Sequence, residues 1–234
     1  MKDTKIREWY TSDYQNRLRE EMLKEDYDGK FFDEHCTGCR KHEKLYGRSD
    51  RQKYVEQVLA GTFDNKVPEL LRAVLKFQKE GKIDLDERLL DIKMKMFGNA
   101  CNLDCYMCHP RSANTRTISL NKVFKNTGKV FDPDLDPKDG ERMNTLKHDD
   151  EEYLNDVASV AEYTKSIKLI GGEPLVMKNH YKLLDKLVQS GYSDGIGLIY
   201  KTNLSVFKME GYDFRNYFGK FKEFIMKISI DSYG

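Results

Sequence analysis

The second part of this chain alternates between short β-capable runs and helix-like segments, and this alternation constrains the fold more than any other feature. The strand-like runs are 89–97, 166–170, 195–203 and 224–231, and the helix-like segments are 149–163 and 178–191. In the first run Leu90, Ile92 and Met94 alternate with charged residues, which is the period of a half-buried strand. Such alternation favours parallel strands joined by right-handed crossovers. We therefore predict an α/β fold whose chemistry lies at the carboxyl ends of about four parallel strands.

The first 85 residues or so lack this alternation of strand-like and helix-like segments and are predicted to be helical. Ser49 is followed three places later by Gln52, which is the pattern of a helix-capping box. A further helix is predicted where Pro68 occupies a first turn and Gly81 follows the last. The expected organisation is a helical N-terminal region over 1–85 and an α/β domain over 86–234.

Composition excludes several classes of protein. The 40 basic and 39 acidic side chains of the 234-residue chain leave a net charge of +1, so no general nucleic-acid or anionic-membrane surface is indicated. The polar N-terminus is no signal peptide, and no apolar run is long enough for a membrane span. Five clustered cysteines argue against a disulfide framework. We expect a reducing, cytoplasmic location, which would be the host cytosol if the protein is viral.

The cysteines form a pair and a triplet. They are Cys36 and Cys39 (the cysteine pair) and Cys101, Cys105 and Cys108 (the cysteine triplet). A structural zinc site needs four closed ligands, usually as two short pairs, and would leave one thiol of the triplet without a role. Three thiolates on a [4Fe–4S] cluster, which normally takes four, leave one iron open, as a catalytic site requires. His109 adjoins the triplet, as a fourth ligand or as an ordinary loop residue.

A second motif, GGEP, closes the second predicted strand. Gly171 and Gly172 allow backbone angles forbidden to other residues and let a ligand approach the chain closely. Glu173 supplies a carboxylate at the strand end, and Pro174 suits the first turn of a following helix. Alone the motif fits an ordinary strand–helix turn, but after a cysteine triplet at a strand end it indicates a cofactor site.

Together these residues resemble the radical S-adenosylmethionine (SAM) enzymes. The resemblance implies a partial (βα) barrel in which the triplet binds a [4Fe–4S] cluster, SAM chelates the open iron, and GGEP holds the SAM amino group. It also implies SAM contacts from the ends of the third and fourth strands and from the position before the last cluster cysteine. Those positions are Asn203, Ser229, Asp231 and Met107.

The implied activity is that of an oxidoreductase. An electron donor of the flavodoxin or ferredoxin kind would reduce the cluster, SAM would be cleaved to a 5′-deoxyadenosyl radical, and the radical would abstract hydrogen from an unidentified substrate. The segment around the cysteine pair resembles the twitch or SPASM element of phage and bacterial relatives. It implies an auxiliary iron–sulfur cluster or zinc at Cys36 and Cys39, and it favours a peptide substrate.

Two points stay open at this stage. The chain ends after its fourth predicted strand, so the family's fifth and sixth strands are expected to be missing from a fragment or supplied by a partner. A non-catalytic zinc- or iron–sulfur-binding interaction module, including one for electron transfer, is the alternative function. This alternative function does not explain why the GGEP motif lies at a strand end.

Overall fold

The computed structural model divides into two compact units, Met1–Asp86 (unit 1) and Glu87–Gly234 (unit 2). The structure describes residues 4–23, 30–50, 52–53, 56, 60, 67–86, 88, 90–95, 98–128 and 150–230. Each unit is treated by itself below.

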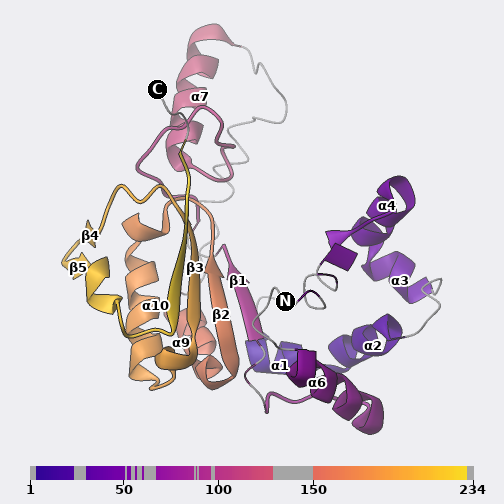
Figure 1. The fold of residues 1–234 in the computed structure, drawn as a ribbon. Helices are drawn as coiled ribbons and strands as arrows, with labels where there is room; N and C mark the ends of the chain where they lie inside the picture. Colours follow the sequence, from indigo (N-terminus) through magenta and orange to yellow (C-terminus); the bar gives the residue numbers. More distant parts are fainter. Residues whose placement is uncertain are drawn as a thin grey trace. The chain divides into compact units, whose positions relative to one another are not determined.

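Unit 1 is helical in its described part, as the sequence predicts (Figure 1). Its helices are α1 (Ile6–Thr11), α2 (Asp13–Met22), α3 (Lys30–His35), α4 (Thr37–Tyr46) and α6 (Val67–Glu80). The start of α2 is stabilised because the Ser12 side chain accepts a hydrogen bond from the Gln15 N–H, which has no partner within the helix. Helix α6 carries Pro68 in its first turn and ends before Gly81, in agreement with the prediction.

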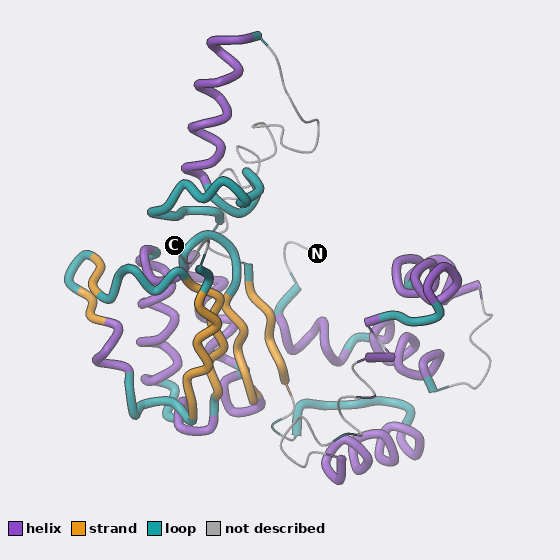
Figure 2. The backbone as a smooth tube through the Cα atoms, turned by 45° about the horizontal axis from the view of Figure 1, so that its top comes forward, coloured by secondary structure: helices purple, strands orange, loops and turns teal. Residues whose placement is uncertain are grey.

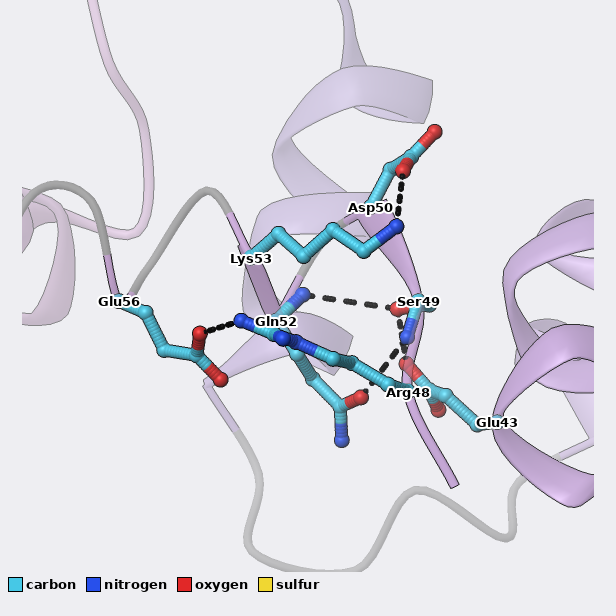
Figure 3. Close-up of polar contacts among 7 residues, drawn as sticks. All are labelled: Glu43, Arg48, Ser49, Asp50, Gln52, Lys53 and Glu56. Atoms are coloured by element: carbon cyan, nitrogen blue, oxygen red, sulfur yellow. Dashed lines mark hydrogen bonds and ion pairs between the residues drawn. The ribbon is translucent and has the colours of Figure 1, made fainter. Parts of the chain in front are cut away.

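The predicted capping box at Ser49 is confirmed (Figure 3). The Ser49 N–H donates to Oε1 of Gln52 over 2.9 Å, and the Gln52 N–H donates to Oγ of Ser49 over 3.5 Å. The Ser49 hydroxyl also donates to Oε1 of Glu43 over 2.6 Å, which ties the box to α4. Arg48 pairs with Glu56 across the same turn. We interpret these polar contacts around Ser49 as a structural helix cap.

Unit 2 contains a four-stranded sheet in the order β1-β2-β3-β6, and every neighbouring pair is parallel. The strands are β1 (Leu90–Met94), β2 (Thr164–Leu169), β3 (Gly197–Thr202) and β6 (Glu223–Ile228); the helices of at least ten residues are α7 (Asn114–Thr127), α9 (Asp150–Ser159) and α10 (Lys178–Gln189). The predicted α/β class and the four parallel strands are confirmed. A small antiparallel hairpin, β4 (Lys208–Met209) with β5 (Tyr212–Asp213), was not predicted.

One face of the sheet packs against α9 and α10. In register across the strands, Ile167 pairs with Leu198 and Leu169 with Tyr200, and all four side chains are at most 1% exposed. Helix α10 buries Tyr181, Leu183, Leu184 and Leu187 completely. Each such side chain contributes roughly 1.5–3 kcal/mol of hydrophobic stabilisation. This core holds the strands in place, and the opposite face of the sheet carries the charged positions.

Helix α7 lies between the cysteine triplet and α9 in sequence and was missed by the sequence reading. Its apolar residues Ile118, Val123 and Phe124 are each at least 41% exposed in unit 2. They do not form the buried stripe by which a helix is usually recognised. No helix in the described part of the chain is both long and apolar enough to cross a membrane.

Candidate metal centre

A cavity of about 560 Å³ opens at the carboxyl ends of the strands of unit 2. In parallel sheets ligands bind at this edge, and the volume suits a small molecule. Its lining residues come from β1, the loop after it, and the ends of β2, β3 and β6. They are Lys93, Lys95, Cys101, Leu103, Cys105, Cys108, Ser112, Lys168, Ile170, Gly171, Gly172, Glu173, Lys201, Thr202, Asn203 and Ser229. Figure 2 shows the strands side by side with loops at their ends.

The cysteine triplet lies on a loop, residues 98–113 (the cysteine loop), that is held from both ends. The Asn99 side chain is fully buried and donates to the Pro110 carbonyl over 2.8 Å. The Cys101 N–H donates to Oδ1 of Asn114, the first residue of α7, over 3.0 Å. These hydrogen bonds between protein groups fix the path of the cysteine loop.

Within the loop, a tight turn brings the last two cysteines together. The Cys108 N–H donates to the Cys105 carbonyl over 3.0 Å. The Thr115 hydroxyl of α7 donates to the Leu103 carbonyl over 2.6 Å, between the first and second cysteines. The start of α7 therefore braces the loop, so that all three thiols line one cavity.

The two glycines of GGEP position the cysteine loop against the end of β2. The Gly172 N–H donates to the Ser112 carbonyl over 2.9 Å, and the Glu173 N–H donates to the Ala100 carbonyl over 2.8 Å. Gly172 has φ +43°, and a Cβ added there would lie 2.1 Å from the Ala100 oxygen. Gly171 has φ +94°, and a Cβ there would lie 2.7 Å from Cγ of Lys95. The close approach that these glycines permit is thus made by the chain itself, by the Ala100 backbone at Gly172 and by the Lys95 side chain at Gly171.

Glu173 is held by the end of β3. It is 1% exposed, and its Oε1 accepts from the Thr202 hydroxyl over 2.6 Å and from the Leu175 N–H over 3.1 Å. Its Oε2 accepts from the Asn203 N–H over 2.6 Å. A buried carboxylate is stabilised when it accepts several hydrogen bonds, and these three fix its orientation. Thr202 was missed in the sequence because its partner lies 29 residues away.

The cysteine triplet fits a cluster better than a single ion. The three thiols are partly buried, and burial raises the pKa of Cys101, with the nearby charges of Glu173 and Cys108 raising it further. Metal loading must therefore release a proton there. Among the described residues, no group of three or more His, Cys, Asp or Glu side chains converges on one metal ion. A closed mononuclear zinc site needs ligands that converge on one ion, whereas a cubane takes its thiolates on separate iron atoms.

The other predicted site residues divide into three groups. Asn203 and Ser229 line the cavity, and the Asn203 amide donates to Oδ1 of Asn102 in the cysteine loop over 3.0 Å. Pro174 is buried in a short 3₁₀ turn, and Met107 is 79% exposed; neither is among the described lining residues. Asp231 lies outside the described residues.

Neither His109 nor the cysteine pair is among the described lining residues. Nδ1 of His109 accepts from the Arg111 N–H over 3.1 Å. Cys36 is the N-cap residue of α4, and Cys39 lies in the first turn of that helix, both in unit 1.

Four lysines line the cavity and were not recognised as site residues: Lys93, Lys95, Lys168 and Lys201. The period-two pattern of the first strand does place Lys93 opposite the apolar face. Their convergence depends on strand register, which that pattern does not supply.

Comparison with known proteins returned one match. The model of the family described as "4Fe-4S single cluster domain" matches residues 91–230, which is more than half of the chain and includes every residue that lines the cavity. No curated protein and no solved structure matches the chain.

Proposed function

Because the chain belongs to the 4Fe-4S single cluster domain family, we propose that it is a radical SAM enzyme whose cluster is bound by Cys101, Cys105 and Cys108. The observation that carries the proposal is that these three thiols and the GGEP glycines and glutamate line one cavity at the carboxyl edge of a parallel sheet. The four parallel strands are compatible with part of a (βα) barrel.

We assign different binding roles to the residues around the cavity. Three thiolates hold the cluster and leave one iron for the amino and carboxylate groups of SAM. Glu173 has about four acceptor positions and uses three of them on the protein, which leaves one for the SAM amino group. Asn203, Ser229 and Asp231 are proposed contacts of the SAM ribose, and Met107 of the adenine.

When bound and reduced, the cluster held by Cys101, Cys105 and Cys108 would supply one electron for the reductive cleavage of SAM to methionine and a 5′-deoxyadenosyl radical, and that radical would leave as 5′-deoxyadenosine after taking a hydrogen atom from the substrate. A flavodoxin- or ferredoxin-like protein is the proposed electron donor. The protein's own part is to orient SAM and substrate and to exclude water from the cavity.

The test is anaerobic reconstitution of the full chain with iron and sulfide, followed by dithionite and SAM. We expect the visible absorbance of an iron–sulfur cluster and the formation of 5′-deoxyadenosine. The Cys105→Ser variant should lose both signals, because a thiolate ligand is removed. Glu173→Gln should keep the cluster and bind SAM about tenfold more weakly, since the charge facing the ammonium group is lost.

Glu162→Gln, at an exposed glutamate outside the cavity, is the matched control and should behave as wild type. Tight zinc binding without a cluster would sink the proposal and favour the interaction module. A cluster that forms but never cleaves SAM would replace it by an electron-transfer role.

A further inference from the structure

The charged face of the sheet in unit 2 carries a concentration of lysines that the proposed chemistry does not use. We define the lysine patch as Lys93, Lys95, Lys168, Lys201 and Lys227. Lys93 pairs in register with Lys168 across β1 and β2, and Lys201 with Lys227 across β3 and β6. All except Lys227 line the cavity that contains the cysteine triplet.

No described carboxylate forms an ion pair with this patch. None of the ion pairs found among the described residues involves a patch lysine. Among the described lining residues Glu173 is the one carboxylate, against four lysines. Asp91 accepts from the Ser166 hydroxyl over 2.5 Å, toward the amino ends of the strands.

Like charges in register across neighbouring strands repel, so the patch destabilises the unoccupied protein. The repulsion is visible at Lys168: burial lowers the pKa of its ammonium group, and the charges of three other patch lysines lower it further. An anion bound among them would relieve both effects, because it supplies the missing countercharge.

The chemistry of lysine narrows the class of anion. A lysine ammonium is a compact point charge that binds phosphate well, and four of them around one cavity match a group with two or more negative charges, such as phosphate or diphosphate, better than a singly charged carboxylate. The described lining includes no arginine. The cavity of about 560 Å³ is of small-molecule size.

We infer that the substrate of this site is a small molecule that carries a phosphate or diphosphate group, bound by the lysine patch. This inference rests on the proposed function, because the same cavity would hold SAM. It differs from the peptide substrate that the SPASM-like segment favours. The phosphate end would lie along β1–β3, and the hydrogen donor would face the cysteine loop.

The test uses inorganic pyrophosphate as the probe, titrated calorimetrically into the full chain before and after cluster reconstitution. Wild-type protein should bind pyrophosphate with an affinity that falls as salt is raised. The Lys168→Gln and Lys201→Gln variants should each bind about tenfold more weakly, and the double variant weaker still. Lys222→Gln, at an exposed lysine outside the cavity, is the control and should bind as wild type.

Circular dichroism and cluster absorbance show whether each variant is folded and loaded. Absence of pyrophosphate binding to wild-type protein would overturn the inference, as would equal binding by the double variant and the control. Lysine-dependent binding without any 5′-deoxyadenosine formation would support the anion site while contradicting the radical SAM activity, so the two failures are distinguishable.

Discussion

At the scale of single residues, Gly172 contributes most to the geometry of the site. Its backbone joins the end of β2 to the cysteine loop, and its missing side chain leaves room for the Ala100 carbonyl. A residue that the sequence indicates as a ligand contact thus also acts as the packing surface for the loop that carries the thiols.

Replacing Gly172 by alanine should therefore displace the cysteine loop. A left-handed conformation costs a non-glycine residue roughly 1–2 kcal/mol, and the added Cβ would also clash with the Ala100 oxygen at 2.1 Å. Gly191→Ala is the matched control, since Gly191 has φ +80° but open space around its Cα. Iron content after reconstitution is the measurement. We expect Gly172→Ala to lose most of its iron and Gly191→Ala to keep it; equal iron contents would refute the packing role.

At the scale of elements, α10 is fastened to β3 by a buried polar pair. His180 is 0% exposed, and its Nε2 lies 2.8 Å from the Tyr200 hydroxyl, also fully buried. Burial lowers the pKa of His180 to about 3 from the ordinary 6.5. The folded protein therefore contains this imidazole in its neutral form over most of the acidic range.

This pair predicts a pH dependence of stability. Because the folded pKa lies below the unfolded one, the unfolded chain binds one more proton than the folded chain between pH 6.5 and about 3. Stability from this group is complete above pH 6.5 and falls with decreasing pH by about 1.4 kcal/mol per unit. His180→Gln, which can still bond Tyr200, should flatten that slope between pH 7 and 5. Urea unfolding followed by circular dichroism measures it, because the only tryptophan, Trp9, lies in unit 1.

The matched control is His109→Gln, at a partly exposed histidine of the same unit. It should keep the wild-type slope. A slope unchanged in His180→Gln would show that the buried imidazole does not account for the loss of stability in acid.

Much of the secondary structure of unit 2 could be predicted from the periodicity of its apolar residues. The features that could not be predicted depend on contacts between residues far apart in the sequence. The alternation of Leu90, Ile92 and Met94 located β1, and the helical spacing in 178–191 located α10. Helix α7 was missed because only four of its fourteen residues are apolar, so the segment carries a weak helical pattern. That the cysteine triplet and Glu173 lie at the carboxyl edge of the sheet could be predicted from local motifs. Thr202 and the lysine patch could not, since they become neighbours only through strand register.

At the scale of the whole molecule, the two groups of cysteines lie in different units. The triplet lies in the region that matches the single-cluster family, whereas Cys36 is the N-cap residue of α4 in unit 1. No described His, Asp or Glu joins the cysteine pair in a metal-binding group. The auxiliary cluster or zinc expected at this pair therefore stays a prediction without geometric support.

We expect the Cys36→Ser/Cys39→Ser double variant to bind as much iron as wild-type protein, and the Cys101→Ser/Cys108→Ser variant to bind almost none. Elemental analysis of iron and zinc in reconstituted protein makes the comparison, with the same serine chemistry in both variants as the internal control. Loss of about half the iron from the first variant would instead reveal a second cluster in unit 1, and loss of zinc alone would reveal a zinc site.

The bracing of the cysteine loop also bears on how the protein recovers from oxygen. The loop is fixed by Asn99, Asn114 and the backbone at Gly172 and Glu173, none of which is a thiol. Contacts that involve no thiol therefore hold its path, unlike that of a zinc finger, which unfolds without metal. After oxidative loss of iron, the emptied loop should keep its path. Repeated cycles of damage and reassembly are then limited by the supply of iron and sulfide rather than by refolding.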